Sequence, residues 1–379
     1  MKEKVNIIFF PTIESHIDNF VPVIKKIEEC HSSDFSCNIL YIPDLISRKF
    51  TLNGINSNYT KIIEGKWFEI EKILNLFFSN FNEGLLFLGN DSGKFTKKII
   101  RIAKTRNFII VLLQDGWLDN ININKPIKIN YSTQWRYYIK WMLAHKYSPF
   151  KNQMDGFIGQ NSNYFFVYSE KAKDEFIKAG ICQSKIRITG SPRHSMLTDD
   201  RKHRMNPPKN FVYFSTPAIN LQDSTSMRNM LFEIIQELKA NYEDFNLIIK
   251  NHPSEIFYDF DLSSENNVHI YQGDIEELLK EIEIDFAFSY NSTVILELLV
   301  KKIPVIQLLP KTRSISDSGY FSFLSTLEST NELIFAINHV RLKSENTNQY
   351  YKFLIDLDSC HNSVDTVVSE IKNLIYENR

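Results

Sequence analysis

A histidine follows one of the most apolar runs of the chain, at a point where its ring would be held in one direction. Lys250, Asn251, His252 and Pro253 come directly after the run NLII. Proline fixes its own φ angle and restricts the residue before it to an extended conformation. An imidazole held in this way suits contact with a phosphate, because its charge changes easily near neutral pH. A turn histidine that makes only a backbone hydrogen bond fits the same residues.

A second polar group combines hydroxyls with the start of a predicted helix. In the segment SYNSTVILELL (289–299), a strand-like beginning is followed by Asn291, Ser292 and Thr293. Hydroxyls and backbone N–H groups at a helix start bind phosphate oxygens, and the helix dipole adds to this. Ordinary N-capping explains the same residue types. Glu297 falls about one turn inside the helix, where it would either reach a ribose or face solvent.

A carboxylate stands at the end of a third apolar run. The strand-like segment FIIVLL (108–113) leads to Gln114, Asp115 and Gly116. Glycine permits a sharp turn that exposes the acid, and a carboxylate placed there can act as a general base for a hydroxyl nucleophile. An Asp-Gly turn without a catalytic role is the alternative.

Four weaker groups also follow predicted strands. They are Pro11 to His16, Gly89 to Asp91, Gly190 to Arg193, and Ser215 to Pro217. Ligands of doubly wound sheets bind at the carboxyl ends of the strands, so these residues would line the rims of the sheets. Each group also reads as an ordinary loop.

Three other patterns give little support to a site. LGNDSGK (88–94) lacks the spacing of a phosphate-binding loop, which argues against a nucleotide triphosphatase. The acidic triplets at 259–261 and 356–358 do not follow convincing strands, and we expect no metal or other cofactor. The aromatic and basic segment 134–147 could touch a membrane surface or an acceptor, although such a stripe more often packs in a core.

The composition excludes several classes of protein. Lys plus Arg is 44 and Asp plus Glu is 45, so the positive field of a general nucleic-acid binder is missing. The amino-terminal apolar run stops at Pro11 after six residues, and we therefore expect neither a secretion signal nor a membrane span. The four cysteines form no CxxC pair, as expected of a cytoplasmic protein with reduced thiols.

The elements that must position these residues alternate along the chain. In the first half, segments of helical period separate short apolar strands at 5–10, 38–42, 85–89, 108–113, 164–169 and 185–190. In the second half, predicted helices at about 226–241, 275–283 and from Asn291 separate strands at 210–216, 245–253, 267–271, 285–290 and 303–309. This alternation predicts two parallel, doubly wound sheets.

A polar stretch divides the two halves. With 379 residues the chain is long enough for two domains, and TDDRKHRMNPPKN (198–210) reads as a linker. We predict an N-terminal Rossmann-like domain over 1–198, a linker over 199–210, a C-terminal Rossmann-like domain over 211–345 and a helical tail over 346–379. In the tail, apolar residues available for packing are Phe353, Val364, Val367, Val368, Ile371 and Ile375.

Taken together, these motifs resemble a known group of enzymes. Two Rossmann-like halves, with YSEKAKDEFIKAGICQSKIRITGSPR (168–193) closing the first, resemble glycosyltransferases of the GT-B fold. The order QDG (114–116), NHP (251–253) and SYNST (289–293) resembles bacterial sialyltransferases and the related capsule and teichoic-acid transferases with cytidine-nucleotide donors. The resemblance implies an α/β fold whose two Rossmann-like domains face each other across a cleft, followed by the C-terminal helical tail.

The resemblance also implies roles for the residues. Asp115 would be the catalytic base of an inverting, metal-independent transfer, and His252 would offset charge on the leaving phosphate. The donor would be CMP-sialic acid or a similar CMP-ulosonic acid, and the acceptor a hydroxyl of a surface glycan such as capsule or lipooligosaccharide. Donor-binding residues would be Asn251, Pro253, Ser289, Asn291, Ser292, Thr293, Glu297, Ser215, Thr216 and Gly190, and acceptor-side residues Gln114, Gly116, His16 and Asn90.

Several alternatives stay open at this point. The related sialyltransferases usually carry a second acid where this chain has Gln114, and some relatives with other cytidine donors carry His at the position of Asp115. A CDP-glycerol or CDP-ribitol phosphotransferase and a UDP-sugar transferase therefore remain as readings, as do a sugar-nucleotide 2-epimerase and a non-catalytic nucleotide-sugar-binding protein. The expected location is the cytoplasm, with peripheral contact to the inner membrane surface left open.

Overall fold

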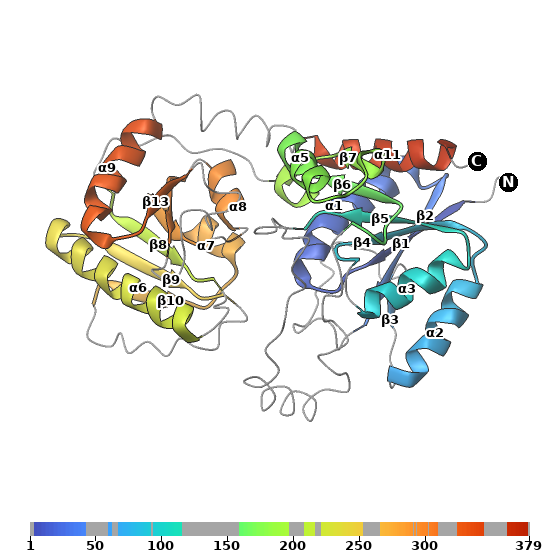
Figure 1. The fold of residues 1–379 in the computed structure, drawn as a ribbon, viewed down its shortest axis with the longest axis horizontal. Coiled ribbons are helices and arrows are strands. Elements are labelled where there is room, and N and C mark those ends of the chain that lie inside the picture. Colours follow the sequence, from blue (N-terminus) through green and yellow to red (C-terminus); the bar gives the residue numbers. More distant parts are fainter. Residues whose placement is uncertain are drawn as a thin grey trace. The chain divides into compact units, whose positions relative to one another are not determined.

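The chain forms two compact units. A computed structural model describes residues 4–42, 60–62, 67–91, 94–115, 159–196, 208–216, 221–252, 266–290, 292, 294–301, 303–309, 324–344 and 362–377. The N-terminal unit comprises Met1–Asp115, Ile121–Met196 and Asp356–Arg379, and the C-terminal unit comprises Gly116–Asn120 and Leu197–Ile355. Each unit is an α/β fold and is described by itself (Figure 1).

The described strands of the N-terminal unit form one parallel sheet. Their order across the sheet is β3-β2-β1-β4-β5-β6-β7, which contains the 3-2-1-4-5-6 order of Rossmann folds. Five of the six residues of β1 are buried, as expected of a parallel strand covered on both faces. The bounds are β1 Val5–Phe10, β2 Phe35–Tyr41, β3 Thr60–Ile62, β4 Gly84–Leu88, β5 Phe108–Leu113, β6 Tyr164–Val167 and β7 Ile186–Ile188.

Helices cover both faces of this sheet. α1 (Glu14–His31) and the last helix, α11 (Ser363–Glu377), pack together on one face, where Phe9 and Phe20 meet. α2 (Trp67–Ser79) and α3 (Lys94–Lys104) lie on the other face, where Phe10 contacts Phe95 (Figure 1). The shorter elements are α5 (Glu170–Lys178) and the 3-10 helices η4 (Gln183–Lys185) and η5 (Pro192–Met196).

The C-terminal unit repeats this architecture. Its described strands form a second parallel sheet in the order β10-β9-β8-β11-β12-β13, again the Rossmann order. The strands are β8 Asn210–Phe214, β9 Asn246–Lys250, β10 Val268–Tyr271, β11 Phe286–Ser289, β12 Val305–Leu308 and β13 Ser325–Leu327. The strand order reverses between β8 and β11, and ligands bind at such a point in doubly wound sheets.

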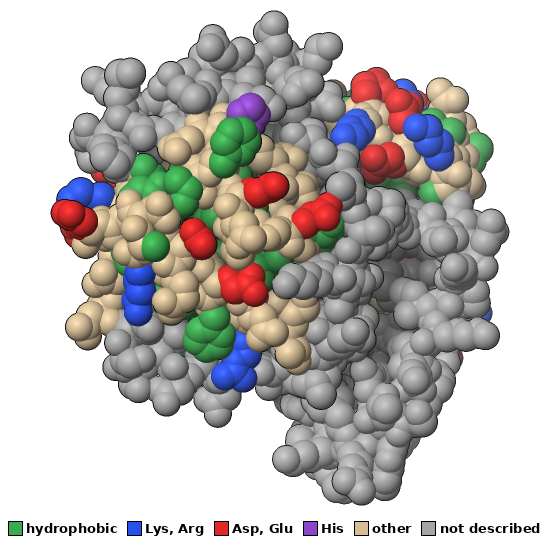
Figure 2. Space-filling model, turned by 60° about the vertical axis from the view of Figure 1, so that its left-hand side comes forward, with side chains coloured by type: hydrophobic (Ala, Val, Ile, Leu, Met, Phe, Trp, Pro, Cys, Tyr) green, Lys and Arg blue, Asp and Glu red, His purple; other side chains and the backbone are tan. Residues whose placement is uncertain are grey.

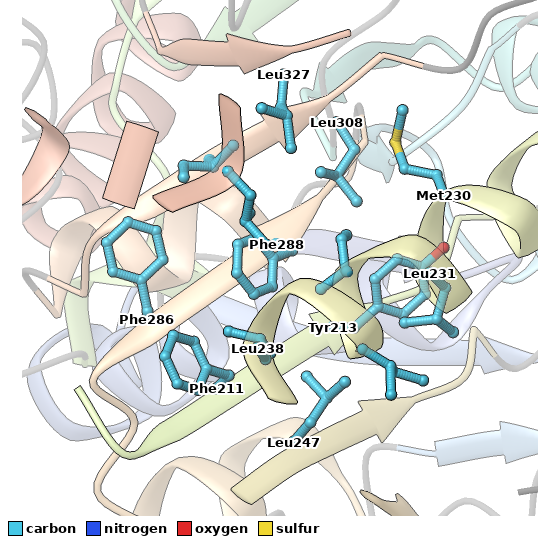
Figure 3. Packing of buried hydrophobic residues seen from close by; sticks show 14 of the residues in the cluster. Phe211, Tyr213, Met230, Leu231, Leu238, Leu247, Phe286, Phe288, Leu308 and Leu327 are labelled. Atoms are coloured by element: carbon cyan, nitrogen blue, oxygen red, sulfur yellow. The ribbon is translucent and has the colours of Figure 1, made fainter. Parts of the chain in front are cut away.

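The core of the C-terminal unit lies between the sheet and two long helices. α6 (Leu221–Asn241) and α9 (Leu333–Ser344) contribute residues such as Leu231 and Ile337, which pack on the aromatic rings of β8 and β11 (Figure 3). The remaining elements are α7 (Ile275–Glu281), α8 (Val294–Val300) and the 3-10 helix η7 (Thr330–Glu332). Figure 2 shows the described outer surface of this unit, where charges of both signs are interspersed with single hydrophobic side chains.

The predicted alternation of strands and helices is confirmed. Each of the eleven predicted strands overlaps an observed one. Most observed strands are shorter than predicted by one to four residues, whereas β2 begins three residues earlier than predicted. The helix expected from Asn291 begins at Val294, and the one expected from about Ser226 begins at Leu221. Sequence reasoning did not identify β3, α2, β13 and α9. No helix of the described residues is long and apolar enough to cross a membrane.

Candidate active site

The carboxyl end of β5 presents two polar side chains with different surroundings. Gln114 is buried, and its Oε1 accepts a hydrogen bond of 3.0 Å from the backbone N–H of Tyr168 after β6. Its side chain therefore joins two strand ends. The side chain of Asp115 is 15% exposed, so this carboxylate is the one of the pair that a substrate can reach.

Three side chains from the beginning of α1 surround the Asp115 carboxylate. Ser15 Oγ donates to Oδ2 at 2.6 Å, and Asn19 Nδ2 donates to Oδ1 at 3.1 Å. His16 Nε2 lies 3.5 Å from Oδ2. A carboxylate has about four acceptor positions. Three of them face α1, and one position on Oδ1 has no donor among the described residues.

His16 lies next to Asp115 and is buried. Its side chain is 2% exposed, and burial lowers its pKa, while the nearby Asp115 charge acts in the opposite direction. The backbone N–H of Thr12 donates to Nδ1 at 3.1 Å. Because Nδ1 accepts this bond, the proton of the neutral ring is on Nε2, the nitrogen that faces Asp115.

Gly89, after β4, makes room for this ring. A Cβ at position 89 would lie 2.3 Å from Cδ2 of His16 and 2.4 Å from its Nε2. Any side chain there would displace the imidazole. Gly89 therefore has a steric role, and this role could not be recognised from its position in the sequence after a strand.

The neighbouring acid after β4 has a structural role. The Asp91 carboxylate is buried and accepts backbone hydrogen bonds from Gly159, Asn161 and Ser162 at 2.8, 2.9 and 3.0 Å. Burial raises the pKa of Asp91, while these bonds act in the opposite direction. The carboxylate therefore joins the end of β4 to the residues before β6. Asn90 beside it is half-buried.

The residues after β7 pack against the same part of α1. Gly190 adopts a φ of 73°, a left-handed conformation that favours glycine. The turn leads into η5, where the backbone N–H of Arg193 donates to Asn19 Oδ1 at 3.2 Å. Asn19 therefore links η5 to Asp115 with the two ends of its amide. Gly190, which we predicted to be donor-binding, belongs to the N-terminal unit.

In the C-terminal unit, hydroxyl groups join the ends of β8, β9 and β11. Ser215 Oγ accepts the backbone N–H of His252 at 2.7 Å, and Ser289 Oγ donates to the carbonyl of Phe214 at 3.2 Å. Thr216 Oγ1 donates to the carbonyl of Tyr290. The structure thus brings Ser215, Thr216, Ser289 and His252 together at the point where the strand order reverses. Ser215 and Ser289 are buried, and their hydrogen bonds connect neighbouring strand ends.

His252 is half-buried beside a buried cation. Its pKa is lowered by burial and, to a smaller extent, by the charge of Lys250. The Lys250 side chain is 9% exposed. The imidazole is therefore neutral at pH 7 in the absence of ligand. Next to it, Asn251 Oδ1 is buried without a hydrogen-bond partner among the described residues.

The start of α8 contributes Ser292 to this group. Its Oγ accepts the N–H of Val294 at 3.4 Å, which is a long helix-capping bond. Glu297 is buried in α8 and does not face solvent. Pro253, Gly116, Asn291 and Thr293 lie outside the described residues, as do the segment 134–147 and residues 199–207 of the predicted linker.

The sequence analysis missed one residue that contacts Asp115. Asn19 was not considered, although Ser15 and Asn19 are polar residues four apart in a helix whose other residues include Phe20, Val23 and Ile24. Residues at this spacing share one face of a helix.

The described residues contain no group of three or more His, Cys, Asp or Glu side chains that could hold a metal ion.

Solved structures match this chain over nearly its whole length, while no family model and no curated protein does. The UDP-GlcNAc 2-epimerase from Methanocaldococcus jannaschii has a TM-score of 0.59 at 15% identity, covering 98% of this chain and 100% of that one. The Neisseria meningitidis UDP-GlcNAc 2-epimerase bound to UDP-GlcNAc has a TM-score of 0.59 at 12% identity, covering 97% of this chain and 100% of that one. The wall teichoic acid polymerase TagF soaked with CDPG has a TM-score of 0.60 at 14% identity, covering 98% of this chain and 89% of that one. The chain therefore has the fold of these proteins, two Rossmann-like units of the GT-B type.

Proposed function

We propose that this protein is an inverting glycosyltransferase that moves a group from a nucleotide-activated donor to a hydroxyl of an acceptor. Asp115 takes the proton of the attacking hydroxyl. His252 and Ser292 hold the phosphate of the donor, whose negative charge grows as the bond to the transferred group breaks. The proposal needs no metal ion.

The environment of Asp115 is the observation that carries the proposal. Three donors from α1 fix the carboxylate, and one of its acceptor positions has no donor among the described residues. A fixed carboxylate with one such position suits a general base, because the incoming hydroxyl then has a single place to bind. An Asp in a plain turn needs no such support.

The phosphate site rests on the charges at the end of β9. The buried Lys250 supplies a positive charge close to His252, and a phosphate would offset the repulsion between this charge and a protonated imidazole. Asn251 Oδ1 offers a buried acceptor that a hydroxyl or an amino group of the nucleotide would satisfy.

We further propose that the donor is a cytidine nucleotide. The motifs around Asp115, His252 and Ser292 favour a CMP-activated ulosonic acid such as CMP-sialic acid, with a glycan hydroxyl as acceptor. The similarity to TagF, which was soaked with CDPG, supports a second cytidine donor, of the CDP-glycerol type. Contact of the segment 134–147 with a membrane stays a prediction.

A calorimetric comparison of CMP, CDP, UDP and GDP tests the donor. We expect CMP or CDP to bind at least about tenfold more tightly than UDP and GDP, equivalent to about 1.4 kcal/mol. If CMP binds best, incubation with a CMP-activated ulosonic acid and a panel of glycans should give a product whose anomeric centre is inverted. If CDP binds best, CDP-glycerol should give a glycerol phosphate ester of the acceptor and release CMP, because this donor has no anomeric centre. Equal or tighter binding of UDP would contradict a cytidine donor.

A sugar-nucleotide 2-epimerase is the second candidate. It is favoured by the similarity to the two UDP-GlcNAc 2-epimerases, which extends over nearly the whole chain. Such an enzyme needs no acceptor. If the protein incubated with UDP-GlcNAc alone released an epimer or free sugar, this reading would replace the transferase.

A further inference from the structure

His16 is a buried histidine whose two ring nitrogens both face protein atoms. Nδ1 lies 3.1 Å from the backbone nitrogen of Thr12, and Nε2 lies 3.5 Å from Asp115 Oδ2. With 2% of its side chain exposed, it cannot touch a substrate. A buried polar ring costs free energy unless it is paired, so a role for the ring has to be sought in what it contacts.

The contacts of the ring fix its tautomer. A backbone N–H can only donate, so the Nδ1 that faces Thr12 carries no proton. The hydroxyl of Thr12 lies 3.3 Å from the same nitrogen and can donate to it as well. The neutral ring must therefore carry its proton on Nε2 and present an N–H to the carboxylate of Asp115.

The position of the ring is fixed by packing. Gly89 leaves the space that the ring occupies, since a Cβ there would lie 2.4 Å from Nε2. On its other side, the ring of Phe20 stands 6.2 Å away, measured between centroids. The Nε2–H cannot turn away from Asp115 without displacing β4 or α1.

Two other acids on the neighbouring elements have partners of their own. Asp18 is half exposed on α1 and lies 3.9 Å from the guanidinium of Arg193 on η5. Asp91, after β4, is bound by the backbone of 159–162. Of the described groups that contact Asp115, His16 alone can change its charge; Ser15 and Asn19 donate as neutral groups.

We propose that His16 is a positioning residue for the base: its Nε2–H holds the Asp115 carboxylate in one orientation, so that the remaining lone pair on Oδ1 faces the acceptor hydroxyl. This inference rests on the proposed function for its catalytic part. The contact between ring and carboxylate exists whatever the reaction is, and it can be measured separately.

Kinetics of the transfer reaction test the catalytic part. His16→Phe keeps a ring of similar size but removes the N–H, and we expect kcat to fall about tenfold or more, the usual effect of losing a hydrogen bond to a charged group. Affinity for the donor nucleotide should not change.

Two further variants separate positioning from folding. His16→Gln retains an N–H donor and should keep more activity than His16→Phe. Gly89→Ala leaves every polar group in place but displaces the ring, and should give a similar loss of kcat with unchanged donor affinity. His31→Phe, at the far end of α1, is the matched control and should behave as the parent. A parental kcat in both His16→Phe and Gly89→Ala would overturn the proposal.

Nuclear magnetic resonance of the ¹⁵N-labelled histidines tests the contact without any activity. We expect the Nε2–H tautomer for His16, and a lower pKa for its ring in Asp115→Asn than in the parent, because the Asp115 charge raises it. An Nδ1–H tautomer, or a ring that does not respond to Asp115→Asn, would disprove the contact. If the contact is found but no transfer can be detected, the proposed function fails while the arrangement stands.

Discussion

The donors to Asp115 come from distant parts of the chain. Ser15 and Asn19 precede it by 100 and 96 residues. The position of Asp115 at a strand end could be predicted, because a run of apolar residues followed by a polar one marks that end. Which helix residues meet it could not, because this depends on how α1 is rotated about its axis, and that rotation is set by the packing of Phe20, Val23 and Ile24.

Replacing Asp115 by Asn should remove the base and keep its shape. We expect turnover to fall by at least about a hundredfold, the contribution of a positioned base. Nucleotide affinity should be nearly unchanged, since the phosphate-binding residues belong to the C-terminal unit. Rate measurements and calorimetry on the same preparation check both statements, with the exposed Asp34→Asn as control. Parental turnover in Asp115→Asn would show that another group is the base.

His252 should make nucleotide binding depend on pH. Burial lowers the pKa of His252, so its ring is neutral near pH 7 in the protein without ligand. A bound phosphate stabilises the protonated form, so binding takes up a proton and the affinity should rise as the pH falls from 8 to 5.5. In His252→Ala the affinity should be weaker and should change less over this range. Calorimetry in buffers with different ionisation enthalpies measures the proton uptake directly.

At the scale of elements, the short helix η5 shows how a polar residue can be buried without a visible partner. His194 is 2% exposed, and neither of its ring nitrogens has a hydrogen-bond partner among the described residues. Its ring packs on that of Tyr168, with 6.1 Å between centroids. Burial and, to a smaller extent, the charge of Arg193 lower the pKa of His194 to about 3. The ring is therefore neutral in the folded protein over the whole physiological range.

This histidine should make the protein sensitive to acid. In the unfolded chain the ring takes up a proton below about pH 6.5, whereas the folded protein does not until about pH 3. The free energy of unfolding should thus decrease as the pH falls through this interval, by up to about 1.4 kcal/mol per pH unit. His194→Phe should flatten this dependence. Chemical denaturation between pH 4 and 7 measures the slope, and His31→Phe should retain it.

Asp91 gives a second prediction at this scale. Its carboxylate satisfies three backbone N–H groups, two of which belong to Gly159 and Asn161. Asp91→Ala leaves these buried donors unpaired, and each such group costs about 1–3 kcal/mol. We expect faster hydrogen exchange at 159–162 and a lower melting temperature. Unchanged exchange at these amides would mean that the carboxylate is not what holds the segment.

At the scale of the whole molecule, the alternation of strands and helices was sufficient to predict both sheets. Buried parallel strands are continuous apolar runs, and such runs are visible in any sequence. The short strands β3 (TKI) and β13 (STL) contain one apolar residue each and therefore give no such signal. α9 has no clear apolar period either. Sequence reasoning also did not identify where the C-terminal tail packs, since apolar residues at helical spacing do not specify a partner.

The tail should stabilise the N-terminal unit specifically. Val367, Ile371 and Leu374 of α11 are completely buried in the core that α1 and β1 share. Ile371→Ala should lower the free energy of unfolding of that unit by about 2–5 kcal/mol, the usual cost of such a truncation in a core. Hydrogen exchange should accelerate in β1 and α1. Tyr376→Ala, at a position that is 75% exposed, is the control.

This arrangement of α11 has a consequence for biosynthesis. Residues 363–377 leave the ribosome after every described strand of the C-terminal unit, yet they complete the core built around β1. The core of the unit that is synthesised first therefore cannot be completed until translation reaches the tail, and until then the nascent chain lacks the side chains of Val367, Ile371 and Leu374 that fill it.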